Sequence, residues 1–360
     1  MAMSTIFDYL RWRGDLSFIE SRLGEIDSAI FSMMSYVDYK KLCHGENCTL
    51  SEAASEYCTD GKYEKVSLGL IFPSKQINRT FCEAARTKRY GGALITDFDA
   101  RTSHEDGYQF GAVTYHIDCN RMVVIFRGTD DSIVGWREDC RLAFLDEIPA
   151  QRMAVEYLER IAKKYPDEKM YVMGHSKGGN LAIYSAIKCS DEVKERILRV
   201  YSLDGPGFSR SVLESEDYAK VQSKLAILIP QSSTVGTMFE KGDKYSVVKS
   251  TNSGVFQHDP YSWVLDGPRF IKLKELSKAG KKNEEQFRRR MSKMTSEEKR
   301  EFIETLFDVV DATGARTLTE LTRGGPKKLN TIIKTYNGLD KEKREMMTEI
   351  FLRILELKKA

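Results

Sequence analysis

Ser176 stands between two glycines at the end of an apolar run. The stretch 171–180 reads YVMGHSKGGN and places the serine between Gly174 and Gly178. This G-x-S-x-G pattern, set where a strand would meet a helix, is typical of a nucleophile elbow, the sharp turn that exposes a catalytic serine hydroxyl. A serine hydroxyl attacks a carbonyl efficiently only beside a base, an acid that orients the base, and hydrogen-bond donors for the oxyanion. The chain must supply these three parts if Ser176 is a nucleophile.

The base can be found by elimination. Enzymes with this elbow carry their triad in the chain order serine, acid, histidine, so the base must follow Ser176. Only His258 does, among the five histidines His44, His104, His116, His175 and His258. It lies in a loop-like stretch, 253–261, after the last expected strand. We therefore predict His258 as the general base, and the alternative is a surface histidine without a catalytic role.

Asp204 is the predicted orienting acid. It ends the strand that follows the elbow helix, in the turn Leu203-Asp204-Gly205, and a carboxylate there can reach across the sheet edge to an imidazole. Most α/β-hydrolases place the acid after the next strand, but here that strand runs into 229–233, IPQSS, which contains no carboxylate. Asp259 and Asp266 remain alternatives. The alternative role for Asp204 is to cap its turn, as aspartates often do.

Two backbone N–H groups are predicted to form the oxyanion hole. The first belongs to Lys177, the residue after the nucleophile, at the start of a helix whose dipole favours negative charge. The second belongs to Thr129, in a loop that follows the apolar run 123–126. Gly128 precedes it and would allow close approach to the nucleophile. This machinery requires no metal and no organic cofactor.

These motifs resemble a known family. The run Phe126-Arg127-Gly128-Thr129, followed by Trp136 and Asp139 and then by the elbow, resembles the class 3, fungal-type lipases. Together with the segments 8–15, DYLRWRGD, and 257–259, QHD, the chain is more similar still to the Mbeg-like family of bacterial proteins in the α/β-hydrolase superfamily. The resemblance covers residues 6 to 268. It implies an α/β-hydrolase fold, an oxyanion donor on Thr129, and a mainly structural role for the segment 136–139.

The chain departs from the lipases at two positions. The lipase aspartate falls on Ser232 or Ser233, which leaves the acid in question. Lys177 replaces the usual leucine after the nucleophile. A cation there could lower the pKa of the histidine or favour an anionic head group, whereas the alternative is a solvated lysine at a helix start.

The surrounding pattern is that of a mostly parallel sheet with helices on both faces. From residue 108 onward, short β-branched or apolar runs alternate with stretches of helical periodicity. The expected strands are 109–116, 122–126, 170–174, 198–203, 225–229 and 245–248, and the expected helices are 26–39, 77–90, 150–164 and 177–188. Beyond 270, a capping box at Thr295 and Glu298 opens a helix, and Asp340 opens a last one.

Length and charge divide the chain in two. We expect an α/β-hydrolase domain over 1–270, with a mainly helical part over 1–107 and the sheet core over 108–270, and a basic helical region over 271–360. That region holds 22 Lys and Arg against 15 Asp and Glu. The net charge of the whole chain is only +3, which argues against a nucleic-acid partner. The basic helices could contact a membrane surface peripherally.

Targeting and cysteine patterns predict a cytoplasmic protein. Residues 1–13 carry scattered charges without the apolar run and cleavage site of a secretion signal. The seven cysteines, an odd number spread over 43–189, argue against a disulfide framework and for a reducing compartment. No second Cys or His pair accompanies Cys43, His44 and Cys48 at the spacing of a zinc site.

We therefore expect a serine hydrolase, specifically a lipase-like carboxylic ester hydrolase that forms an acyl-enzyme on Ser176 and acts on a small-molecule or lipid ester. Two alternatives stay open. A thioesterase, peptidase or acyltransferase could use the same residues, because one scaffold hosts several chemistries. A non-catalytic member could instead use the fold as a binding module, and the missing aspartate after the later strand favours that alternative.

Overall fold

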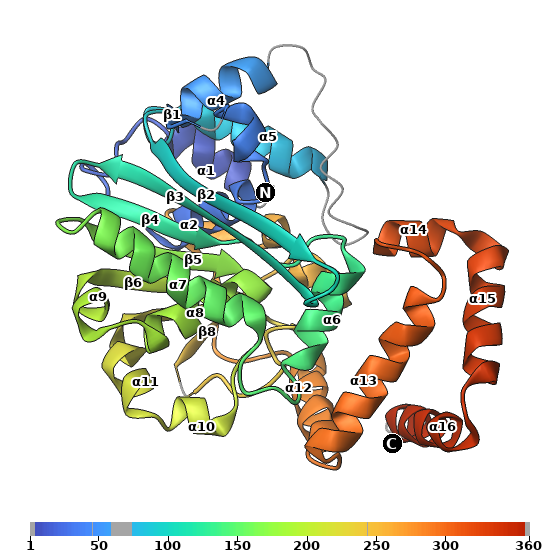
Figure 1. The fold of residues 1–360 in the computed structure, drawn as a ribbon. Helices are drawn as coiled ribbons and strands as arrows, with labels where there is room; N and C mark the ends of the chain where they lie inside the picture. The colour runs from blue at the N-terminus through green and yellow to red at the C-terminus, as the bar shows by residue number, and fades with distance from the viewer. Residues whose placement is uncertain (1–3, 45, 59–73, 243, 357–360) are drawn as a thin grey trace.

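A nine-stranded mixed sheet forms the centre of the molecule (Figure 1). The computed structural model describes residues 4–44, 46–58, 74–242 and 244–356. The strands follow one another in the order β1-β2-β3-β4-β5-β6-β7-β8-β11. Their bounds are β1 Cys48–Thr49, β2 Leu94–Ser103, β3 Tyr108–Asp118, β4 Arg121–Phe126, β5 Lys169–His175, β6 Ile197–Leu203, β7 Leu225–Pro230, β8 Tyr245–Val248 and β11 Lys272–Leu273, with a separate hairpin of β9 Leu265–Asp266 and β10 Arg269–Phe270.

The five strands β4 to β8 pair in parallel, and the strands outside them pair antiparallel. All six strands expected from the sequence are present within one or two residues of their predicted bounds. The sequence pattern missed β2, whose residues LITDFDARTS are mostly half-buried or exposed and so form no apolar run. Because neighbouring parallel strands end at the same edge, residues that follow β4, β5, β6 and β7 meet there.

Helices cover both faces of the sheet. Their bounds are α1 Ile6–Arg13, α2 Glu25–Met34, α3 Tyr39–Leu42, α4 Leu50–Tyr57, α5 Ser74–Ala85, α6 Ile133–Arg141, α7 Pro149–Lys164, α8 Lys177–Lys188, α9 Asp191–Arg196, α10 Arg210–Leu213, α11 Glu216–Val221, α12 Lys278–Met291, α13 Ser296–Asp311, α14 Leu318–Arg323, α15 Gly325–Gly338 and α16 Lys341–Glu356. The expected helix over 177–188 matches α8, and that over 150–164 matches α7 within one residue. The helix expected over 26–39 ends early, at Met34.

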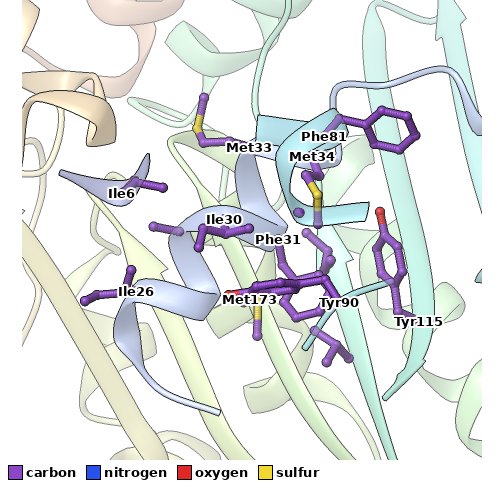
Figure 2. Close-up of a cluster of buried hydrophobic side chains, with 14 of the residues drawn as sticks. Ile6, Ile26, Ile30, Phe31, Met33, Met34, Phe81, Tyr90, Tyr115 and Met173 are labelled. Carbon is purple, nitrogen blue, oxygen red and sulfur yellow. The ribbon is translucent and has the colours of Figure 1, made fainter. Parts of the chain in front are cut away.

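Each parallel strand contributes side chains to two cores. In β4, Val123 and Ile125 pack with the N-terminal helices, whereas Val124 and Phe126 pack with α7 and α8. This two-sided burial explains why the strands are unbroken apolar runs. Figure 2 shows the N-terminal core, in which Phe31 of α2 lies beside Tyr90, Tyr115 and Met173.

A buried ion pair fixes the N-terminal helices. The guanidinium of Arg89 donates to both carboxylate oxygens of Asp27 at 2.7 Å, and both side chains are fully buried. The hydroxyls of Tyr9 and Tyr90 also donate to Asp27. A buried charge pair needs such additional partners to offset its desolvation. Tyr9 belongs to the segment 8–15, so this part of the family resemblance has a structural role.

The expectation of unpaired cysteines is wrong. Disulfides join Cys43 to Cys48 and Cys58 to Cys82, and the second ties the end of α4 to α5. Cys119, Cys140 and Cys189 are free thiols. The first bridge pairs cysteines only five residues apart, and the second pairs two that helix packing brings together, which the spacing along the chain does not reveal. The cytoplasmic prediction thereby loses one of its two supports, because disulfides persist mainly in oxidising compartments.

Helix α13 of the C-terminal region packs against α6, and α15 and α16 pack against α13. The predicted cap forms, since the Thr295 hydroxyl accepts the N–H of Glu298 at the start of α13. Ile303 and Phe307 of α13 form a small apolar cluster with Ile133 of α6. Figure 1 shows α13 beside α6, with α14, α15 and α16 further from the sheet. Among the described residues, none of the helices combines the length and the apolar character that a membrane span needs.

Candidate active site

The predicted elbow is present at the end of β5. Ser176 lies between β5 and α8 with φ 58° and ψ −131°, a conformation that non-glycine residues adopt only where the surrounding structure enforces it. The flanking glycines are required for packing. A Cβ at Gly178 would lie 2.1 Å from the carbonyl oxygen of Phe126, and one at Gly174 would lie 2.3 Å from the backbone of Gly178. A Cβ at Gly179, the residue after Gly178, would likewise lie too close to the Ser202 hydroxyl.

The structure brings the predicted base and acid together. The Nδ1–H of His258 donates to Oδ2 of Asp204 at 2.6 Å, and the two residues are 5% and 0% exposed. Asp204 follows β6 directly, and His258 ends a 3-10 turn over Gly254–His258. Asp204 also has a positive φ, 49°, which turns its carboxylate away from the path of the strand. This bond leaves Nε2 of His258 as the nitrogen that could accept a proton.

Two further donors hold the Asp204 carboxylate. Its Oδ1 accepts the Ser233 hydroxyl at 2.5 Å and the N–H of Gly236 at 3.1 Å. Ser233 is one of the two serines at the position where the lipase resemblance would place an aspartate. The carboxylate therefore follows β6, one strand earlier than the lipase resemblance would place it, and Ser233 after β7 donates to it. Ser233 and Gly236 were not predicted, and only the absence of a carboxylate in 229–233 pointed to this region.

The alternative acids lie elsewhere. Asp259 caps the 3-10 turn Pro260–Ser262 by accepting the N–H of Tyr261 at 3.0 Å, and burial raises the pKa of its carboxyl to about 6. Asp266 is exposed in the β9–β10 hairpin, opposite Arg269. Neither carboxylate forms a hydrogen bond with the His258 ring among the contacts of the described residues.

The Gly128–Thr129 loop lies directly beside Ser176. A Cβ at Gly128 would lie 2.6 Å from the carbonyl oxygen of His175 and 3.2 Å from Cβ of Ser176. Thr129 is buried, and its hydroxyl donates to Oδ2 of Asp139 at 2.5 Å. Burial raises the pKa of Asp139 to about 6, although the nearby Lys177 opposes this shift. The Thr129 hydroxyl is thus held by α6, which fixes the orientation of the residue.

The side chain of Lys177 is not a solvated lysine at a helix start, so that interpretation from the sequence is wrong. It is fully buried, and its ammonium donates to Glu138 at 2.9 Å and to the carbonyl and side-chain oxygens of Gln109 at 2.7 and 2.9 Å. Burial of a lysine requires such a carboxylate partner, and Glu138 was not recognised as one. The backbone N–H of Lys177 lies in the first turn of α8, where N–H groups have no intrahelical acceptor.

His175, the variable residue of the elbow, supports the loop that carries the base. Its Nε2–H donates to the carbonyl oxygen of His258 at 2.8 Å, and the two rings lie 4.5 Å apart. Burial and the neighbouring His258 hold the pKa of His175 well below its usual value, so the ring is neutral. Chain order excluded His175 as the general base, and no sequence signal indicated this supporting role.

A metal centre is not formed by the described residues: no cluster of three or more His, Cys, Asp or Glu side chains is placed to hold an ion. Cys43 and Cys48, considered with His44 as zinc ligands, bond to each other.

Sequence comparison assigns the family. A model of the Mbeg1-like family matches residues 84–308, which is more than half of the chain and includes the elbow, Asp204 and His258. The chain belongs to the Mbeg1-like family. The matched region spans β2 to most of α13, so it includes every strand of the sheet except β1, together with α12 and most of α13. Its mostly parallel sheet with helices on both faces is the α/β-hydrolase fold expected from the sequence.

The chain is also similar to solved structures, among them lipases. A fungal lipase–inhibitor complex is 16% identical, with 62% of this chain and 78% of that chain covered at a TM-score of 0.37. A mutant of MDLA from Penicillium cyclopium is 13% identical, with 70% and 86% covered at 0.41. A lipase–propeptide complex from Rhizomucor miehei is 14% identical, with 65% and 75% covered at 0.36. No curated protein sequence matches this chain.

Proposed function

We propose that this Mbeg1-like protein is a serine hydrolase that cleaves carboxylic esters, in the manner of lipases, through an acyl-enzyme on Ser176. One observation carries the proposal. The serine of a strained elbow and the hydrogen-bonded pair of His258 and Asp204 all follow strands of the same parallel sheet, in the chain order of a catalytic triad. A pair of this kind, 2.6 Å apart and buried, has the geometry that orients an imidazole.

The proposed reaction has two halves. His258 Nε2 takes the proton of the Ser176 hydroxyl as its oxygen attacks the ester carbonyl, and the N–H groups of Thr129 and Lys177 stabilise the negative charge on the carbonyl oxygen. Collapse of this intermediate breaks the ester bond, and His258 returns the proton to the departing alcohol. Water, activated by His258, then attacks the acyl-enzyme and releases the acid. Asp204 stabilises the imidazolium in both halves.

The arrangement of Asp204 favours an enzyme over a non-catalytic binding protein. The missing aspartate after β7 was the feature that favoured the binding module, and Asp204 with its support from Ser233 offers a carboxylate in its place. Thioesters and acyl transfer remain alternative chemistries on the same residues, because each begins with the same acyl-enzyme.

A screen of p-nitrophenyl esters of graded acyl length tests the proposal. We expect turnover by the wild-type chain, a loss of about 10⁴-fold or more in Ser176→Ala, and a large loss in Asp204→Asn. Asp266→Asn, an exposed carboxylate in a hairpin, is the matched control and should keep wild-type kcat. Turnover that survives Ser176→Ala contradicts the mechanism. Turnover of thioesters without turnover of oxygen esters selects the alternative chemistry.

Several finer predictions remain with this proposal. The substrate is a small-molecule or lipid ester, no nucleic acid is bound, and the basic helices beyond residue 270 could touch an anionic membrane surface. The domain boundary at 270 also remains a prediction, although the sheet receives strands from both sides of the 108–270 core, β2 and β11. The cytoplasmic location remains a prediction as well, and the disulfides weigh against it.

A further inference from the structure

The C-terminal region pairs with the loop that follows Thr129. Residues 316–318, between α13 and α14, run antiparallel to residues 131–133, with Ser132 opposite Thr317. The N–H of Ile133 donates to the carbonyl oxygen of Arg316 at 3.0 Å, and the N–H of Leu318 donates to that of Asp131 at 2.9 Å. The segment 316–318 lies outside the region that the family model matches. This pairing therefore joins the loop to a part of the chain with no counterpart in that match.

The side chain of Asp131 strengthens the pairing. It is 4% exposed, and its carboxylate accepts the N–H of Thr319 at 3.3 Å to each oxygen. Thr319 lies in the first turn of α14, where N–H groups lack intrahelical acceptors. Asp131 is only two residues from Thr129, so the contact acts close to the proposed oxyanion donor.

Helix α13 holds α6 through side-chain ion pairs. Arg137 of α6 pairs with Asp308 at 2.9 Å and with Asp311 at 3.2 Å, and Arg141 pairs with Glu304 at 2.7 Å. The apolar cluster around Phe307 packs under these ion pairs. Asp139 of α6 accepts the hydroxyl of Thr129. The contacts between α13 and α6 therefore also act on Thr129, through Asp139.

We propose that residues 304–319 are a positioning element for the oxyanion hole: they hold the loop 128–133 and α6 so that the Thr129 N–H keeps its place beside Ser176. This inference rests on the proposed function. Oxyanion donors must be held within about 0.5 Å of their productive positions, and a loop at a sheet edge does not achieve this without support. Removing one donor outright typically lowers kcat by about 10² to 10³, so loosening its loop should cost about tenfold.

The matched pair Leu318→Pro and Leu318→Ala isolates the backbone contact. Both variants lose the leucine side chain, but only proline loses the N–H that donates to Asp131. Leu318 is the first residue of α14, the helix position that best tolerates proline. The preceding Thr317 has φ −129° and ψ 155°, the extended conformation that a residue before proline prefers. The helix start can therefore accept proline, whereas the proline ring displaces the Asp131 carbonyl oxygen that lies 2.9 Å from the Leu318 nitrogen.

We expect kcat of Leu318→Pro on a p-nitrophenyl ester to fall about tenfold below that of Leu318→Ala, with KM changed by less than about twofold. Amide hydrogen exchange in the peptide covering 129–135 should be faster in the proline variant. Asp131→Ala should show the same loss against Asp131→Asn, whose amide oxygen can still accept the Thr319 N–H, and this pair serves if the proline variant fails to fold.

Equal kcat within each pair, from active wild-type protein, overturns the inference and leaves the proposed function standing. The inference is also overturned if both variants of a pair lose activity equally and that loss matches the loss of folded protein. Wild-type protein without any ester turnover removes the proposed function, and the inference with it. A faster exchange of 129–135 that accompanies a selective loss of kcat supports it.

Discussion

Among single residues, the proposed acid Asp204 depends on a residue that follows a different strand. Asp204 provides the carboxylate from the end of β6, and Ser233, after β7, donates to it. Residue types alone indicated Ser176 and His258, because the elbow pattern and chain order constrain them. They could not indicate Ser233, His175 or Glu138, since a serine, a histidine and a glutamate have no distinguishing spacing until folding brings them to a partner.

Ser233→Ala should lower kcat by about tenfold with little change in KM, because a hydrogen bond to a charged group contributes about 1.5 kcal/mol, which corresponds to about tenfold in rate. Ser232→Ala is the matched control, since the Ser232 hydroxyl bonds instead to Ser277 at 2.6 Å. Steady-state kinetics of both variants check this. Equal kinetics in the two variants would show that Asp204 needs no support from Ser233.

The buried carboxyl of Asp259 should make stability depend on pH. Its folded pKa of about 6 lies above the usual 3.8, so the folded state binds this proton more tightly than the unfolded state. The contribution of the group to stability is therefore present below pH 4 and is lost as pH rises to 6. Relative to wild type, Asp259→Asn should gain at most about 3 kcal/mol in free energy of unfolding across that range. Urea titrations at pH 4, 5, 6 and 7 measure it, and a constant difference would contradict the shift.

At the scale of elements, the parallel strands were predictable and the edges of the sheet were not. Strands such as β6 and β7 are buried on both faces and so form apolar runs that a sequence displays directly. In contrast, β2 is half-exposed, and β1 and β11 are two residues long. The contacts between α6 and residues 304–319 join segments more than 160 residues apart, and no local pattern indicates such a pairing.

The elbow makes the sharpest element-scale prediction. Gly178→Ala would place a methyl group 2.1 Å from the carbonyl oxygen of Phe126 at the end of β4, so β4 and α8 would have to separate. We expect a loss of about 3 kcal/mol in stability and a loss of ester turnover. Gly92→Ala is the control, because a Cβ there meets no atom within 4 Å, and it should change stability by less than about 0.5 kcal/mol. Thermal unfolding distinguishes them, and equal stability would show that the elbow can relax.

At the scale of the whole molecule, the disulfides and the C-terminal helices change the interpretation of the chain most. Composition suggested a reduced protein with an accessory basic tail. The structure instead ties the N-terminal helices with two disulfides and places α13 against α6, next to the candidate site. The Cys58–Cys82 bridge and the packing of α13 depend on tertiary contacts, which explains why cysteine counting and charge counting missed them.

Thiol titration of the denatured, unreduced protein should find three free thiols, those of Cys119, Cys140 and Cys189, and seven after reduction. The double variant Cys58→Ser/Cys82→Ser should lose about 3 kcal/mol of stability under oxidising conditions, because the bond closes a loop of 24 residues. Seven thiols before reduction, in protein purified without reductant, would contradict the paired state.

The central claim is that Ser176 is a nucleophile activated by His258. Intact mass spectrometry after treatment with a fluorophosphonate tests it most directly, with peptide mapping to locate the adduct. We expect one covalent adduct, on Ser176, formed in wild-type protein and in Asp266→Asn and absent from His258→Ala. Folded wild-type protein that acquires no adduct, or an adduct on Ser176 that forms equally fast in His258→Ala, would contradict it.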